Sequence, residues 1–204
     1  MKGKKDKKMD LKPIFHQLES IFSGPLSIES HVRSELQCAN TDIDFSYSPT
    51  PLPPSFINVM NRSDSHPICK LINDTPFDWV PPKTSNDPLY IEHSKSKIHI
   101  ELLGPDGLIR SDKVRLGLYG MKPNSEYGLR THPAEELYIM LAGDSDWKRG
   151  NEPYIIHQPG ERSYHPSMMP HASRTRKEAF FSVYAWYGDI STENYNYQGL
   201  PSSN

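Results

Sequence analysis

The spacing of apolar and polar side chains changes about halfway along the chain. In the first part, apolar residues recur every three or four positions, which predicts a helix that begins after Asp10 and ends at Gly24-Pro25. A second short helix is predicted from Ser27 onward. The segments that follow are polar and proline-rich, and we expect extended connectors at 40–54 and 74–88, around a short helix near 68–72.

From residue 97 onward, apolar and polar side chains alternate one by one, which is typical of half-buried strands. In the first such run, Ile98, Ile100 and Leu102 alternate with His99 and Glu101. Further strands are predicted at 114–118, 137–141, 154–157 and 179–187. Because turns rather than helices separate these runs, the sequence predicts a mainly β fold, an antiparallel barrel or jelly roll.

These patterns divide the chain into four parts. Residues 1–9 form a basic tail that is expected to be disordered. Residues 10–94 form a helical and proline-rich extension, which we expect to cover one mouth of the barrel. Residues 95–190 form the barrel, and residues 191–204 form a C-terminal tail.

Composition narrows the classes of partner. The formal net charge is −2 and no basic stripe recurs after the tail, so nucleic acid is not an expected partner. No apolar segment follows the basic tail, which argues against a signal peptide and against a membrane span. Cys38 and Cys69 have no metal-binding spacing and are predicted to be reduced thiols, as in a cytoplasmic protein.

The candidate chemistry lies in the middle of the predicted barrel. His132 precedes a predicted strand, Glu136 begins it, and His171 follows on a separate segment after a Pro-Gly turn. Two imidazoles and a carboxylate from two segments are a suitable ligand set for a divalent metal with open coordination positions. Because side chains alternate along a strand, Glu136 and Tyr138 should point together into a cavity, whereas Leu137 should pack into the wall.

The other histidines in and next to the predicted barrel carry no such pattern. His165 is open between two interpretations, a group beside the metal or a loop residue. His93, His99 and His157 are interpreted as structural, because a lone histidine is more often structural than a ligand.

Several motifs have the order and spacing of a known family. Glu136 followed after six residues by Gly143, and Gly160 followed by Pro166 and His171, match the two cupin motifs. More closely, the chain resembles the cupin-type dimethylsulfoniopropionate (DMSP) lyases from about residue 98 to residue 189. The segments that carry this resemblance are Val114-Arg-Leu-Gly-Leu-Tyr119, Tyr127, His132-Pro-Ala-Glu-Glu-Leu-Tyr138, Leu141-Ala-Gly143, Trp147, His165-Pro-Ser-Met-Met-Pro-His171-Ala and Tyr184-Ala-Trp186-Tyr-Gly188-Asp189.

The resemblance implies a cupin barrel, which is a double-stranded β-helix of jelly-roll type, with an N-terminal helical extension. It implies that one divalent metal ion helps to cleave DMSP, a small-molecule substrate, to acrylate and dimethyl sulfide. Cupins are often dimers, so a homodimer is left open. By position, the implied roles are metal binding for His132, Glu136, His171 and Tyr138, proton abstraction for Tyr138, and substrate binding for Tyr127 and Trp186, with Tyr184 as a further candidate ring.

One position departs from the cupin pattern. Cupins normally have His-x-His at the first ligand position, whereas this chain has Arg130 where the first histidine would stand. Arginine stays protonated and cannot bind a cation. Arg130 either turns outward as a salt-bridge residue, which is the simpler interpretation, or binds the carboxylate of the substrate with its planar fork.

Three functions are compatible with these residues. The first is a metal-dependent carbon–sulfur lyase that acts on DMSP by abstraction of the α-proton and β-elimination. The second is a cupin lyase or isomerase on another small carboxylate, with Arg130 reflecting the different substrate. The third is a non-catalytic cupin that binds a small ligand. The ligand set does not distinguish zinc, iron, nickel and manganese.

Overall fold

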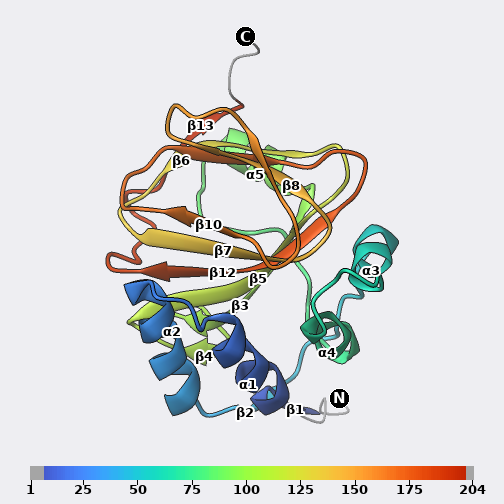
Figure 1. The fold of residues 1–204 in the computed structure, drawn as a ribbon. Helices are drawn as coiled ribbons and strands as arrows, with labels where there is room; N and C mark the ends of the chain where they lie inside the picture. Colours follow the sequence, from blue (N-terminus) through green and yellow to red (C-terminus); the bar gives the residue numbers. More distant parts are fainter. Residues whose placement is uncertain (1–6, 201–204) are drawn as a thin grey trace.

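The chain folds into two facing β-sheets, with most of its helices packed below them in Figure 1. This computed structural model describes residues 7–200. In chain order, the elements are β1 (Lys7–Asp10), α1 (Lys12–Ile21), α2 (Ser27–Cys38), β2 (Asp42–Phe45), α3 (Pro54–Met60), α4 (Ile68–Asp74), α5 (Pro88–Ser94), β3 (Lys97–Gly104), β4 (Ile109–Arg110), β5 (Val114–Met121), β6 (Glu126–Thr131), β7 (Glu135–Ala142), β8 (Ser145–Arg149), β9 (Ile155–His157), β10 (Arg162–His165), β11 (His171–Arg174), β12 (Phe180–Tyr187) and β13 (Asn196–Gly199).

The two sheets form the walls of a barrel. One has six strands in the order β10-β7-β12-β5-β3-β4, and the other has five in the order β13-β6-β11-β8-β9. Neighbouring strands run antiparallel except for the short pair β3 and β4. The predicted mainly β barrel of jelly-roll type is therefore confirmed.

The alternation of side chains along β7 separates two cores. Leu137, Ile139 and Leu141 point out of the six-stranded sheet into a large apolar core that the helices complete. Tyr138 points the other way and belongs to a second, aromatic core between the sheets. Glu136 lies on the same face as Tyr138, and both line a cavity there. Both faces of the strand are thus covered, which explains why β7 is buried almost throughout.

Helices α1 to α4 lie on the outer side of the six-stranded sheet, below it in Figure 1, whereas α5 packs against β3, β6 and β13. Helix α2 packs against β5, β7 and β12, and α3 and α4 pack against β7. The expectation that the extension covers a barrel mouth is wrong for these helices. Their apolar faces pack instead against the apolar side chains that point outward from the six-stranded sheet. The connector 78–84, by contrast, does line the cavity.

Both chain ends add strands. Residues 1–6 and 201–204 lie outside the described residues. Within the predicted basic tail, Lys7–Asp10 form β1, which pairs antiparallel with β2 and buries Met9. Within the predicted C-terminal tail, Asn196–Gly199 form β13, which pairs with β6. Each apparent tail is therefore in part a structural element.

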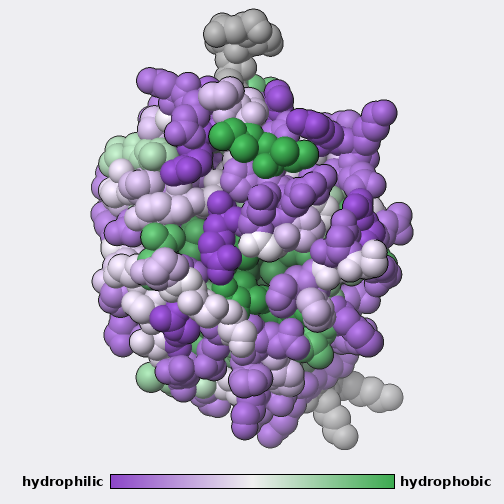
Figure 2. Space-filling model, viewed as in Figure 1, coloured by the Kyte–Doolittle hydropathy of each residue, from purple (hydrophilic) through white to green (hydrophobic). Residues whose placement is uncertain are grey.

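Polar side chains cover most of the face shown in Figure 2, with apolar residues visible in small groups between them. Among residues 7–200, no helix is long and apolar enough to cross a membrane.

Candidate metal centre and cavity

His132, Glu136 and His171 meet inside the barrel. Nε2 of His171 lies 2.9 Å, and Nε2 of His132 lies 3.5 Å, from Oε2 of Glu136. The candidate ligand atoms of the three residues all lie within 4.8 Å of one another, and each residue is at most 2% exposed. His171 begins β11, which pairs with β6, and His132 follows β6, so the pairing of two strands in the five-stranded sheet brings the histidines together.

Both histidines have their second ring nitrogen fixed by the backbone. Nδ1 of His132 lies 3.1 Å from the carbonyl oxygen of Ala134, and Nδ1 of His171 lies 2.8 Å from that of Met169. A carbonyl only accepts, so Nδ1 carries the proton and Nε2 keeps its lone pair. Neither buried Nε2 has a hydrogen-bond partner. Two free imidazole lone pairs that face one carboxylate oxygen fit a divalent cation, and the outer carbonyl contacts are the usual support of a metal-binding histidine.

The charges agree with this fit. Burial would raise the pKa of Glu136, but contacts with His132, His165 and His171 lower it well below its usual range. Burial and the positive charge of Arg130 lower the pKa of His171 well below its usual range. At neutral pH the cluster therefore contains an ionised carboxylate and a neutral imidazole, which are the protonation states that bind metal.

Two further groups hold the carboxylate in place. Trp186 donates its indole Nε1–H to Oε1 of Glu136 over 2.7 Å, which leaves Oε2 facing the histidines. Nδ1 of His165 lies 3.2 Å from Oε2 of Glu136, and its ring stacks on that of His171 at 4.2 Å. Burial lowers the pKa of His165 to about 4, so it is neutral. His165 is thus a group beside the cluster rather than a loop residue.

Tyr138 lies beside this cluster and faces the cavity. Its ring packs against those of Trp147, Tyr119 and Tyr184, and the residue is 3% exposed. Burial and the charge of Glu136 raise the pKa of Tyr138 well above its usual range. The phenol therefore stays protonated unless a cation next to it favours the phenolate.

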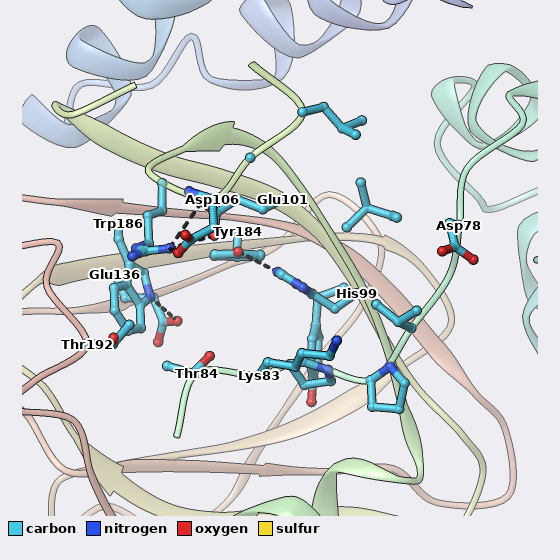
Figure 3. A pocket seen from close by; sticks show the side chains of 18 of the residues that line it. Asp78, Lys83, Thr84, His99, Glu101, Asp106, Glu136, Tyr184, Trp186 and Thr192 are labelled. Carbon is cyan, nitrogen blue, oxygen red and sulfur yellow. Dashed lines mark hydrogen bonds and ion pairs between the residues drawn. The ribbon is translucent and has the colours of Figure 1, made fainter. Parts of the chain in front are cut away.

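The cavity extends from Glu136 to the protein surface. It has a volume of about 530 Å³, and Tyr127, Tyr138, Tyr184 and Trp186 all line it. Figure 3 shows Glu136 and Trp186 on one side of it and the connector with Lys83 and Thr84 on another. The four aromatic side chains that were assigned to substrate binding or proton transfer thus line the same cavity as the carboxylate of Glu136.

Two residues of this region were not predicted from the sequence. His99, which the sequence suggested to be structural, lines the cavity, and its Nε2 lies 2.7 Å from the hydroxyl of Tyr184 (Figure 3). The alternation of side chains in β3 could have predicted this position, because it places His99 on the face opposite to Ile98. Tyr195, placed in the C-terminal tail, lies with its ring parallel to that of His132 at 5.9 Å. Its hydroxyl lies 2.6 Å from that of Tyr127.

Arg130 points into the barrel. The residue is 1% exposed, and its guanidinium carbon lies 3.8 Å from the centre of the Tyr127 ring. The interpretation in which Arg130 turns outward into a salt bridge is therefore wrong. The reason is strand register: Arg130 pairs directly with His171, and directly paired residues project from the same face of a sheet.

Comparisons with known proteins agree with this architecture. The curated dimethylsulfoniopropionate lyase DddQ of Ruegeria pomeroyi is 35% identical to this chain over 91 residues, which are 45% of each protein, so the match spans less than half of that relative. The crystal structure of DddQ from the same organism superposes with a TM-score of 0.62 at 23% identity, over 94% of this chain and 99% of that one. A structure from work on the DMSP lyases RdDddP and RnDddQII gives a TM-score of 0.60 at 18% identity, over 90% of this chain and 99% of that one.

The structural likeness confirms the predicted cupin barrel. The sequence model of the dimethylsulfoniopropionate lyase family matches residues 79–181, about half of the chain, which include the connector at the cavity, the cluster and Tyr138. The chain therefore belongs to the dimethylsulfoniopropionate lyase family.

Proposed function

We propose that this protein is a metal-dependent carbon–sulfur lyase that cleaves DMSP to acrylate and dimethyl sulfide. One observation carries the proposal: two free imidazole lone pairs and an ionised carboxylate converge inside the barrel, and this carboxylate lines the same cavity as Tyr138. The family to which the chain belongs supports the choice of substrate.

The reaction needs a base close to the carbon next to the substrate carboxylate. When bound at His132, Glu136 and His171, a divalent ion supplies Lewis-acid chemistry, which makes that carbon more acidic and favours the phenolate of Tyr138. The phenolic oxygen of Tyr138 then takes the proton. The electron pair of the broken C–H bond forms the double bond of acrylate, and the C–S electron pair leaves with dimethyl sulfide. Tyr138 must return its proton to solvent before the next cycle.

Aromatic rings suit the other end of the substrate. A sulfonium group has no hydrogen to donate, so it is bound through shape and cation–π contact, worth about 0.5–2 kcal/mol per ring. Tyr127, Tyr184 and Trp186 line the cavity and are the rings that we assign to it. Trp186 has a second role, because its N–H also orients Glu136.

Separate measurements of metal content and turnover test these assignments. We expect near-stoichiometric metal in the wild type and its loss in His132→Ala, Glu136→Ala and His171→Ala. Tyr138→Phe should keep the metal and lose turnover, because only the hydroxyl is removed. Unchanged turnover in Tyr138→Phe would exclude the proposed base, and metal retained in all three alanine variants would exclude the proposed ligands.

A second candidate function is a lyase or isomerase on another small carboxylate. The observation that favours it is the inward Arg130, which gives the cavity a positive group at the position where cupins have a histidine. Turnover of a different small carboxylate, with none of DMSP, would support it. The metal's identity, a homodimer and a cytoplasmic location remain predictions.

A further inference from the structure

The centre leaves an unusual set of polar atoms without partners. Among residues 7–200, seven buried side-chain nitrogen or oxygen atoms have no hydrogen-bond partner, and five of them belong to His132, His171, Arg130, Ser173 and Arg149. A bound metal would account for Nε2 of the two histidines. It would not account for Nη2 of Arg130 or Nε of Arg149, because charged guanidinium groups are not metal ligands, and Oγ of Ser173 is a third atom without a partner.

These three residues lie on the inner face of the five-stranded sheet. Arg130 and Arg149 pair directly with His171 from either side. Ser173, two positions further along β11, projects from the same face as His171. The inner face of the sheet therefore has a positively charged arginine on each side of His171.

The guanidinium of Arg130 lies near the two rings that flank Ser173 in the strand register. In register, Ser173 lies between Tyr127 of β6 and Trp147 of β8. The guanidinium carbon of Arg130 is 3.8 Å from the centre of the Tyr127 ring and 5.9 Å from that of Trp147. The Nη2 of Arg130 and the Oγ of Ser173 are therefore two donors on the same face of the sheet that do not bond to each other, and each is without a partner.

The charge of Arg130 is not neutralised by a salt bridge within the described residues. Its Nη1 donates only to the carbonyl oxygen of Gly128, at 3.4 Å. The carboxylate of Glu136 contacts Trp186 and the histidines instead. A fully buried guanidinium with an unused donor carries a desolvation cost that the face of Tyr127 offsets only in part. An anion placed at Nη2 would remove that cost.

We propose that Arg130 and Ser173 form a carboxylate subsite that binds the acid group of a small organic acid and does not depend on the metal. Arg130 supplies the charge-assisted donor, Ser173 supplies a hydroxyl donor, and Arg149 adds positive charge on the other side of His171. The proposal rests on the function proposed above and deepens it, because it assigns a binding group to the carboxylate end of the substrate. A short carboxylic acid held there directs its remaining carbons toward Tyr138 and the aromatic cavity.

Binding of acrylate and of acrylamide tests the subsite without turnover. The two molecules have nearly the same shape, but only acrylate is an anion. We would titrate each by calorimetry into the full-length protein, as purified and after treatment with a chelator. We expect acrylate to bind at least tenfold more tightly than acrylamide in both states, and this preference to fall below about threefold in Arg130→Met. Arg110→Met, in which an exposed arginine is removed, serves as the matched control and should keep the preference.

Several results would overturn the subsite. Equal binding of the two molecules by wild type would do so, as would loss of the preference after chelation, which would mean that the metal alone holds the acid group. An undiminished preference in Arg130→Met would have the same consequence. If that variant does not fold by circular dichroism, the smaller change Ser173→Ala decides: it should weaken acrylate binding severalfold and leave acrylamide binding unchanged, and unchanged acrylate binding would contradict the proposal.

The failure of the subsite differs from the failure of the lyase function. A protein that prefers acrylate through Arg130 but releases no dimethyl sulfide from DMSP would keep the subsite and lose the proposed substrate. A protein that releases dimethyl sulfide but shows no preference for acrylate would keep the function and lose the subsite.

Discussion

Replacing Trp186 by phenylalanine isolates a single hydrogen bond at the centre. The indole Nε1–H donates to Oε1 of Glu136 over 2.7 Å, while the ring stacks on His132 at 4.2 Å and 24°. Phenylalanine keeps an aromatic face against His132 and removes the donor. Glu136 then loses the contact that turns Oε2 toward the histidines, so Trp186→Phe should bind metal more weakly although Trp186 is not a ligand itself.

The expected size of this effect follows from two independent values. A hydrogen bond to a charged group contributes about 1.5–3 kcal/mol. Loss of an outer partner of a metal ligand typically lowers metal affinity about 10- to 100-fold, which corresponds to roughly 1.4–2.8 kcal/mol. The two ranges overlap, so we predict a loss of affinity of about one to two orders of magnitude.

Competition with a chromophoric chelator, with zinc as the probe ion, measures this affinity directly. Trp147→Phe is the matched control, because Trp147 is also buried in the aromatic core but donates to the neutral hydroxyl of Ser145 at 2.8 Å. The control should change the affinity by less than about threefold. An affinity in Trp186→Phe that equals that of the control would refute the positioning role.

Three further predictions concern other parts of the molecule. Burial lowers the pKa of Lys97 from 10.5 to about 7. The unfolded chain therefore binds more protons above about pH 7, and this group should raise the free energy of unfolding by up to about 1.4 kcal/mol per pH unit as the pH rises from about 7 to about 9. Urea unfolding should show a smaller rise in Lys97→Met, and equal rises would contradict the assignment. Tyr195→Ala should release metal to a chelator faster than wild type, because it removes the aromatic ring that lies parallel to His132. Tyr195→Phe keeps the ring and should release metal at the wild-type rate. Equal release rates in the two variants would show that the Tyr195 ring does not shield His132. Leu18→Ala should lower the free energy of unfolding, measured in urea, by about 2–5 kcal/mol. Metal affinity should not change, because Leu18 lies in the large apolar core between the helices and the six-stranded sheet. A change in metal affinity would show that this core and the aromatic core are coupled.

The alternation of residues within β7 was enough to predict which of its side chains face the cavity. A period of two placed Glu136 and Tyr138 on one face and Leu137 on the other, and the purely aliphatic side chains of the Leu137 face identified it as the packed one, although both faces are buried. The barrel itself was predictable for the same reason, since successive short strands separated by turns leave few other arrangements.

Other features depended on contacts that the sequence does not encode locally. The inward direction of Arg130 follows from its pairing with His171, a partner on another strand. Tyr195 reaches His132 only because β13 returns the chain end to β6. The helices of the extension show apolar faces in the sequence, but not that their partner is the outer side of the six-stranded sheet rather than the barrel mouth.

The decisive test of the proposed lyase activity is the amount of dimethyl sulfide in the headspace above purified protein mixed with DMSP, with metal content measured on the same sample. We expect metal-loaded wild type to release dimethyl sulfide and acrylate in equal amounts, and Tyr138→Phe with the same metal content to release neither. No dimethyl sulfide from metal-loaded wild type would contradict DMSP as the substrate, and release by Tyr138→Phe at the wild-type rate would contradict the proposed base.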